Sequence, residues 1–363
     1  MPTPKKNKSA LSEKTSQHSQ SIGSKSAARI KALRKKRINA ADLAERILAG
    51  NKTALSQGIT LVESKQQKHF ESVKTIINTC LPASGKSIRI GITGVPGVGK
   101  STFIEAFGNY LIEQHAKKVA VLAVDPTSSV SHGSILGDKT RMEELVKQEN
   151  AFIRPTASGD SLGGVAQKTR ESVILCEAAG FDVILIETVG VGQSETLVHS
   201  MTDFFLLLKL AGAGDELQGI KRGIMEMADA IVINKADGEN LKPARQAQAE
   251  FKKALHLYPT KESTWKPLVK IASGLHQKGI DRIWEMLETY FKLTKGNGYF
   301  EQLRLEQNKH WLLQTIQDQL KADFYANPKI KQALAEKIEA LERQEVSPFE
   351  AAFDLLQLHK EIS

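Results

Sequence analysis

Apolar residues gather in short continuous runs between residues 88 and 290, with helix-like stretches between the runs. A strand with one solvated face would alternate apolar and polar residues, so continuous runs predict strands that are buried on both faces. Such strands, separated by helices, are typical of a doubly wound α/β domain with a mostly parallel sheet. The predicted strands are residues 88–92, 119–124, 183–186, 204–210, 230–233 and 268–271.

Helical spacing of apolar residues flanks this domain on both sides. From residue 38 it predicts helices that lead into the sheet. After a turn-like break at residues 295–298 it predicts only helices, whose apolar stripes have to be buried on their own domain or on a second copy. The predicted organisation is a basic disordered tail (1–37), an N-terminal helical segment (38–87), the α/β domain (88–294) and a C-terminal helical region (295–363).

Charge is unevenly distributed along the 363 residues, which carry a formal net charge of +9. Residues 1–37 hold eleven Lys and Arg against one acid, Glu13, so the remaining 326 residues are nearly neutral. A basic patch on the folded body, which would favour a nucleic-acid or membrane partner, is therefore not expected. The tail itself suggests a solvated segment or, less well, an organelle transit peptide, since it is richer in Lys than in Arg.

Cysteine usage and hydropathy point to a cytoplasmic protein. Cys80 and Cys176 stand in no C-x-x-C motif and are most simply small buried hydrophobic residues of a reduced chain. The apolar runs, such as residues 204–208, are far shorter than the roughly 20 residues of a membrane-spanning helix.

A phosphate-binding loop follows the first predicted strand directly. The motif G-x-x-x-x-G-K-[ST] is complete, and a helix-competent stretch begins at Thr102. Its backbone N–H groups and the helix N-terminus suit phosphate oxygens, while Lys100 can reach the β- and γ-phosphates and Ser101 can bind Mg²⁺. The loop consists of Gly94, Val95, Pro96, Gly97, Val98, Gly99, Lys100 and Ser101.

Two acids stand at the carboxyl ends of predicted strands, where the ligands of such sheets bind. Asp125 follows residues 119–124, and Glu187 follows residues 183–186. Mg²⁺ prefers oxygen ligands, so either acid is a candidate. Glu187 is favoured because Gly190, three residues further on, could sense the γ-phosphate through its N–H.

The base is predicted to be guanine. Asn234, Lys235 and Asp237 form N-K-x-D after the strand at residues 230–233. The Asp237 carboxylate would accept hydrogen bonds from the guanine N1–H and 2-amino group, a pair of donors that adenine lacks. Ser273 and Leu275, after the next strand, are placed to complete the pocket together with Gly274.

Over about residues 40–360 the sequence resembles the MeaB/ArgK GTPases, relatives of the human methylmalonic aciduria type A protein. The likeness rests on the phosphate loop with Thr102 and on residues 124–129, 137–142, 187–195 and 214–221. The last guanine-binding loop departs from the family pattern: Ser-Ala-Leu followed by Glu-x-x-Gly is replaced by Ser-Gly-Leu-His-Gln-Lys-Gly at residues 273–279.

The resemblance implies a SIMIBI-class P-loop GTPase that converts GTP to GDP with Mg²⁺. It implies a Mg²⁺ region at Ser101, Asp125, Asp138 and Glu187, and a partner-responsive loop at residues 214–221. It also implies a homodimer held by the C-terminal helices. The implied role is that of a chaperone for adenosylcobalamin-dependent methylmalonyl-CoA mutase, or a related acyl-CoA mutase, which gates cofactor loading and protects the enzyme.

Hydrolysis is expected to be slow without a partner, because Val191 rather than a water-orienting Gln follows Gly190. A partner would then complete the catalytic set of Lys100, Glu187 and Lys221 by bringing Lys221 to the phosphates. Other functions stay open, among them a scaffold that binds GTP without hydrolysing it. A nickel metallochaperone GTPase would need clustered His and Cys ligands, whereas the nine His are scattered; an ArgK-type kinase of an amino-acid transport system would need a second substrate site.

Overall fold

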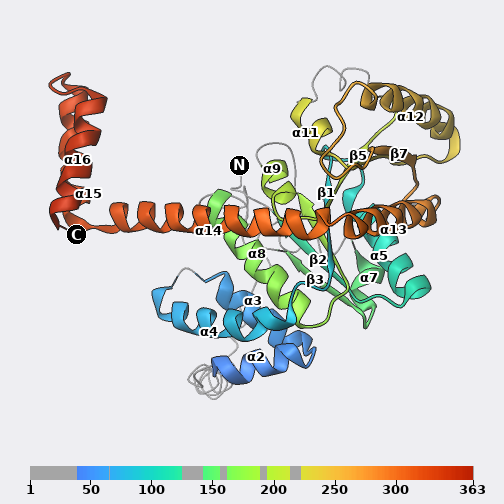
Figure 1. The fold of residues 1–363 in the computed structure, drawn as a ribbon, viewed down its shortest axis with the longest axis horizontal. Helices are drawn as coiled ribbons and strands as arrows, with labels where there is room; N and C mark the ends of the chain where they lie inside the picture. The colour runs from blue at the N-terminus through green and yellow to red at the C-terminus, as the bar shows by residue number, and fades with distance from the viewer. Residues whose placement is uncertain are drawn as a thin grey trace, which may run out of the picture.

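The computed structural model describes residues 39–64, 66–124, 142–155, 162–188, 194–212 and 222–362. Within these residues, the centre of the molecule is a seven-stranded parallel sheet in the order β3-β2-β4-β1-β5-β6-β7 (Figure 1). Along the chain the strands are β1 (Ile88–Thr93), β2 (Val119–Val124), β3 (Ala151–Pro155), β4 (Val183–Thr188), β5 (Phe204–Lys209), β6 (Ala230–Ile233) and β7 (Leu268–Ile271).

The predicted α/β class and all six predicted strands are confirmed, with small shifts at their ends. The prediction missed β3, which is the edge strand beside β2. Only the first three residues of β3 are apolar, and Arg154 and Pro155 follow. Proline is tolerated at a sheet edge, because its missing N–H group removes no hydrogen bond to a neighbouring strand. A short edge strand that ends in Arg and Pro therefore lacks the continuous apolar run by which the other strands were predicted.

Helices cover both faces of the sheet. They are α5 (Lys100–His115), α7 (Glu143–Lys147), α8 (Leu162–Ala178), α9 (Ser194–His199), α11 (Arg222–Met227), α12 (Leu241–Leu255) and α13 (Ile280–Gly296). Strand residues alternate between two buried clusters: Val183 and Leu185 lie with side chains of α5 and α13, and Ile184 and Ile186 lie with those of α8. The continuous apolar runs in the sequence reflect this burial on both faces.

The N-terminal helices pack on the face of the sheet that α8 covers. They are α2 (Ala40–Leu48), α3 (Lys52–Val62) and α4 (Phe70–Cys80), with short 3₁₀ turns at η1 (Gln67–His69) and η2 (Leu81–Ala83). The side chains of Asn39 and Asn51 accept hydrogen bonds from the first turns of α2 and α3 and so mark where these helices begin. Cys80 and Cys176 are both buried in this layer and form no disulfide, as predicted.

Three helices follow Gly298, as predicted. They are α14 (Tyr299–Ala326), α15 (Pro328–Glu342) and α16 (Pro348–Ile362). The first part of α14 lies on the body, and the rest projects away from it to carry α15 and α16 as a hairpin at the far end (Figure 1). With 28 residues, α14 is about 42 Å long at 1.5 Å per residue.

Buried ion pairs fix the base of α14 to the body. Arg304 donates to both carboxylate oxygens of Asp203, at 2.8 and 2.7 Å, and to the carbonyl oxygens of Gly85 and Ser87, each at 2.6 Å. Beside it, Arg89 donates to both carboxylate oxygens of Glu177 at 3.0 Å. We call α14, α15 and α16 the arm. Its direction is set by contacts between segments more than 80 residues apart.

Candidate functional site: a nucleotide-binding edge of the sheet

The predicted phosphate loop joins the central strand β1 to α5. Gly94, the first residue after β1, has φ 154°, and a Cβ there would lie 2.6 Å from the carbonyl oxygen of Leu208. Only glycine fits at this close approach to β5. Because β1 lies between β4 and β5, the loop stands at the switch point of the sheet, where ligands of doubly wound folds bind.

Lys100 begins α5 and folds back over the loop. Its Nζ donates to the carbonyl oxygen of Gly94 at 2.7 Å and to that of Val95 at 3.4 Å, and the residue is 8% exposed. The ammonium group and the first N–H groups of α5 therefore concentrate positive charge over the loop. This arrangement suits an anion of high charge, such as a polyphosphate.

Glu187 reaches the phosphate loop from the neighbouring strand. The register of the sheet pairs Ile92 of β1 with Glu187 of β4, and this pairing places Glu187 beside Ser101. The Ser101 hydroxyl donates to Glu187 Oε1 at 3.3 Å, and Glu187 is 5% exposed. A hydroxyl and a carboxylate side by side form a donor set of hard oxygens, which fits Mg²⁺.

Thr188 secures the end of β4 against β1. Its hydroxyl donates to the hydroxyl of Thr93 at 2.9 Å, and both residues are buried. This contact could not be predicted, because a threonine at a strand end is common and its partner lies 95 positions away.

Several predicted site residues lie outside the described residues. They are Asp125, Asp138, Lys221 and the segments 189–193 and 213–220. Val124, the last described residue before Asp125, pairs with Thr188 in the sheet.

Asn234 links the base-recognition motif to the phosphate loop. Its side-chain amide donates to the carbonyl oxygens of Val98, at 2.9 Å, and Gly99, at 3.4 Å, and its Oδ1 accepts from the N–H of Gly274 at 3.3 Å. Asn234 is 2% exposed. The N-K-x-D motif predicts Asn234 in the base pocket, and in the structure its side chain also connects the loop after β6 with the phosphate loop and the loop after β7.

Asp237 is positioned by the loop after β7. The hydroxyl of the fully buried Ser273 donates to Asp237 Oδ2, and the N–H of His276 donates to Ser273 Oγ at 3.1 Å. Asp237 is only partly buried, so this contact orients its carboxylate while leaving it accessible to a ligand. The contact shows how a serine in the loop after β7 positions an aspartate in the loop after β6.

The rest of this loop packs tightly on α5. A Cβ at Gly274 would lie 3.1 Å from both the nitrogen and the Cα of Phe103, so the glycine in this departure from the family pattern lets the loop approach the helix closely. Leu275 is 74% exposed, and the exposed Lys235 lies beside Gly99. The loop is closed by paired backbone hydrogen bonds between Ser273 and Lys278.

The structure brings the predicted phosphate-binding and base-binding residues to one edge of the sheet. In the described part of the chain, no group of three or more His, Cys, Asp or Glu could hold a metal ion. Among the same residues, no helix is both long and apolar enough to span a membrane.

Comparison with known proteins supports the same assignment. Residues 55–329 match the family model described as methylmalonyl Co-A mutase-associated GTPase MeaB. The chain is 45% identical to the GTPase ArgK of Escherichia coli, over 86% of this chain and 95% of that protein. It is 42% identical to the mitochondrial methylmalonic aciduria type A homolog of Mus musculus, over 86% of this chain and 78% of that protein.

A solved structure agrees with the fold. The crystal structure of a LAO/AO transport system kinase is 36% identical, superposes with a TM-score of 0.71, and covers 90% of this chain and all of that one. Fold, site and relatives together define a P-loop GTPase, an enzyme that binds and hydrolyses GTP. Within that class, the chain belongs to the MeaB family.

Proposed function

We propose that this GTPase is a chaperone of an adenosylcobalamin-dependent methylmalonyl-CoA mutase or a related acyl-CoA mutase, gating cofactor loading and protecting the mutase. The observation that carries the proposal is the family match over residues 55–329, since that family is described as mutase-associated. The mouse relative, described as a methylmalonic aciduria type A homolog, supports it.

GTP would lie along the carboxyl edge of the sheet. Residues 94–102 would hold the phosphates, and Asn234, Lys235, Asp237 and residues 273–275 would hold the guanine. Mg²⁺, when bound, would compensate phosphate charge, with Ser101 and Glu187 as ligands and Asp125 and Asp138 as further candidates. The contact between Ser101 and Glu187 supports this placement.

Hydrolysis would depend on positioning and on charge. Lys100 supplies fixed positive charge over the phosphate loop, where it already contacts the Gly94 carbonyl oxygen. Lys221, brought to the phosphates when the partner binds residues 214–221, would add a second cation. Single-turnover GTP hydrolysis with and without the mutase tests this step. Acceleration by the mutase that is lost in Lys221→Ala is expected, and equal rates with and without the mutase would contradict it.

The C-terminal arm would hold a homodimer. Its helices leave large apolar side chains exposed, among them Leu312 at 62%, Phe349 at 83% and Phe353 at 60%. Side chains of this kind on a projecting element favour burial against a second copy. The dimer would place two GTPase bodies around a shared pair of arms.

Affinity capture tests the choice of client. The full chain would be immobilised and loaded with a non-hydrolysable GTP analogue or with GDP, and bound proteins from a lysate of the source cells would be identified by mass spectrometry. A cobalamin-dependent mutase should be retained in a nucleotide-dependent way. Recovery of no such mutase in either state would contradict the chaperone role while leaving GTP hydrolysis untouched.

A second candidate function is a kinase of an amino-acid transport system. The observation that favours it is the similarity, at 36% identity, to the solved structure of a LAO/AO transport system kinase. Transfer of the labelled γ-phosphate of GTP to a periplasmic amino-acid-binding protein would support this function. Release of all the label as inorganic phosphate would exclude it for the substrate tested.

A cytoplasmic location is part of the proposal. Cys80 and Cys176 are both fully buried and outside any disulfide, in keeping with a reducing compartment. Cell fractionation tests the location, and recovery of the protein in the fraction that holds the mutase is expected.

A further inference from the structure

A second cavity lies on the face of the sheet away from α5, beneath the base of the arm. It has a volume of about 150 Å³ and is bordered by α8, by the two residues after α9, by α14, and by residues of η2, β1 and the segment between them. A cavity that holds one water molecule has a volume of roughly 10–15 Å³, so this cavity has room for a small polyatomic ligand. It contains none of the predicted nucleotide-binding residues.

The cavity is lined by three arginines and by no acidic side chain. Two of them form ion pairs with carboxylates that do not line the cavity: Arg89 with Glu177, and Arg304 with Asp203. The third, Arg170 of α8, has a single hydrogen bond among the described residues, from Nη2 to the hydroxyl of Ser200 at 2.8 Å. Ser200 in turn donates to the carbonyl oxygen of Leu197 at 2.8 Å, so it is a neutral acceptor for Arg170.

Arg170 is therefore a buried cation without a carboxylate partner in the described part of the chain. It is 8% exposed, and burial lowers the pKa of its guanidinium without any compensating charge. A guanidinium offers several N–H donors, and only one is engaged here. Burying a charge is costly unless it is paired, so this arrangement calls for an anion.

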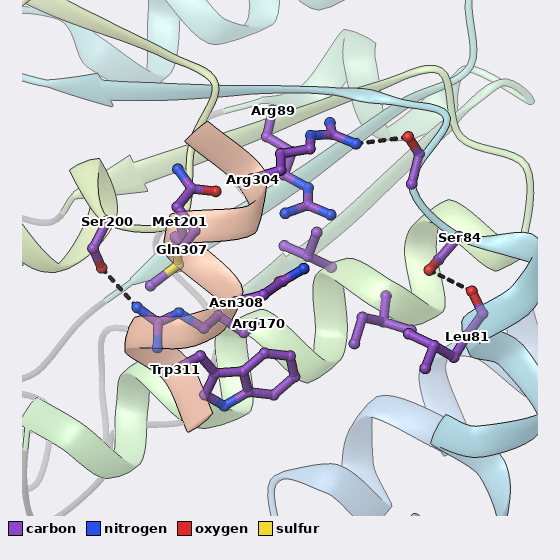
Figure 2. Close-up of a pocket in the computed structure, with 13 residues that line it drawn as sticks. Leu81, Ser84, Arg89, Arg170, Ser200, Met201, Arg304, Gln307, Asn308 and Trp311 are labelled. Carbon is purple, nitrogen blue, oxygen red and sulfur yellow. Dashed lines mark hydrogen bonds between the residues drawn. The ribbon is translucent and has the colours of Figure 1, made fainter. Parts of the chain in front are cut away.

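Neutral groups complete the surroundings of Arg170. Figure 2 shows Arg170 joined to Ser200, with Asn308 and Trp311 of α14 bordering the same space. Trp311 supplies an aromatic wall and is partly buried. Planar guanidinium groups can bind phosphate and carboxylate in a bidentate manner, and Arg170 keeps N–H donors that no described residue engages.

We propose that the cavity between α8, the end of α9 and the base of α14 binds a small oxyanion, a phosphate or carboxylate group held by Arg170. This site is separate from the nucleotide site and does not rest on the chaperone role. An anion here would join three elements: α8, the arm helix α14, and α9, which begins six residues after the end of β4.

Titration of the full chain with inorganic phosphate tests the site. Protein saturated with Mg²⁺ and GDP would be titrated at an ionic strength kept constant with chloride. Trp311 borders the cavity, so tryptophan fluorescence and the thermal midpoint report binding together. Both should change in a saturable way. In Trp311→Phe the fluorescence change should shrink while the thermal stabilisation remains.

Arg170→Gln is the decisive variant, and Arg245→Gln is its matched control. Arg245 is an exposed arginine of α12, so its substitution removes the same charge away from the cavity. Charge-assisted hydrogen bonds predict that phosphate binds at least about tenfold more weakly to Arg170→Gln, and unchanged to Arg245→Gln. Equal phosphate affinity in wild type and Arg170→Gln would overturn the proposal, because any phosphate at the P-loop would contribute equally to both.

Stability without phosphate separates an anion site from a structural arginine. In chloride buffer, Arg170→Met should be at least as stable as wild type, because it removes an uncompensated buried charge. A large loss of stability, together with equal stabilisation of both proteins by phosphate, would overturn the proposal. Glycerol phosphate and acetate then distinguish a phosphate monoester and a carboxylate from free phosphate, and failure of all three anions to bind would also overturn it.

Discussion

At the scale of single residues, substitution of Asp237 tests the prediction that the bound base is guanine. Asp237→Asn replaces a charged acceptor with an amide that presents both a donor and an acceptor. Because hydrogen bonds to a charged group contribute about 1.5–3 kcal/mol each, GTP affinity should fall about 10- to 100-fold. Xanthosine triphosphate, which carries an oxygen in place of the 2-amino group, should gain in relative affinity. Calorimetric titration with both nucleotides measures the change, and an unaltered preference for GTP would remove Asp237 from the base pocket.

Substitution of Glu177 tests how much the buried ion pairs beneath the arm contribute to stability. Burial would raise the pKa of this carboxyl, but the Arg89 charge and hydrogen bonds from Arg89, Ser87 and the Gly85 N–H outweigh burial and lower the pKa below its ordinary value of 4.5. A carboxyl whose pKa is lowered by folding stabilises the protein above its unfolded pKa, and this contribution is lost as the pH falls through the folded pKa.

We therefore expect the wild type to lose stability steeply on acidification below pH 4.5. Glu177→Gln should lower the stability at neutral pH by about 3–5 kcal/mol, because it leaves Arg89 without its counter-charge. Its stability should also depend less on pH in the acidic range. Thermal melting of both proteins across that range measures the difference, and parallel pH profiles would contradict the assignment.

At the scale of elements, Asn234 couples the loop after β6 to the phosphate loop and to the loop after β7. Asn234→Ala leaves the Val98 carbonyl and the Gly274 N–H without this partner, so the protein should lose about 1–3 kcal/mol of stability. GTP and GDP should both bind more weakly, by similar factors, because the loop itself is loosened. Nucleotide titration and thermal melting measure these effects.

Asn240→Ala is the matched control for Asn234. The Asn240 side chain donates only to the Lys235 carbonyl oxygen and is partly exposed, so its loss should have a smaller effect on both measurements. Equal losses in the two variants would show that the contacts of Asn234 with the phosphate loop contribute no more to stability and nucleotide affinity than the hydrogen bond of Asn240.

The prediction of elements succeeded where the signal is local. The strands of the sheet centre carry apolar runs, unbroken in β2 and over the first four residues of β4, and the glycine-rich loop lies directly after β1. Edge strand β3 was missed because Arg154 and Pro155 make up almost half of it. The role of Asn234 as a link between loops could not be predicted, since the residue it contacts at Val98 lies 136 positions away.

At the scale of the whole molecule, the apolar surface of the arm tests the dimer. Phe349→Ser with Phe353→Ser removes two exposed aromatic side chains from α16. The single chain should keep its thermal stability, because these rings bury little area in it, and dimer affinity should fall at least about tenfold. Sedimentation equilibrium measures the association. Leu257→Ser is the control, since Leu257 is 86% exposed on the body, and loss of association in this variant as well would contradict an arm-mediated dimer.

The basic tail gives a further prediction for the whole molecule. Residues 1–37 carry all of the excess positive charge and lie outside the described residues. Our proposal assigns no GTP contact to residues 1–37, so deleting them should change GTP affinity by less than about twofold at physiological salt, where long-range charge effects are screened. A large loss of affinity on calorimetric titration would assign the tail a part in nucleotide binding.

The sequence by itself determined the α/β class, the phosphate loop and the guanine motif, because each depends on residues that are neighbours in the chain. Only the tertiary structure decided which loops Asn234 joins, how Ser273 orients Asp237 and where the arm leaves the body. It also decided that Arg170 is buried without an acidic partner among the described residues. These features depend on residues that folding brings together from distant positions, and a pattern of apolar and polar positions does not encode such pairs.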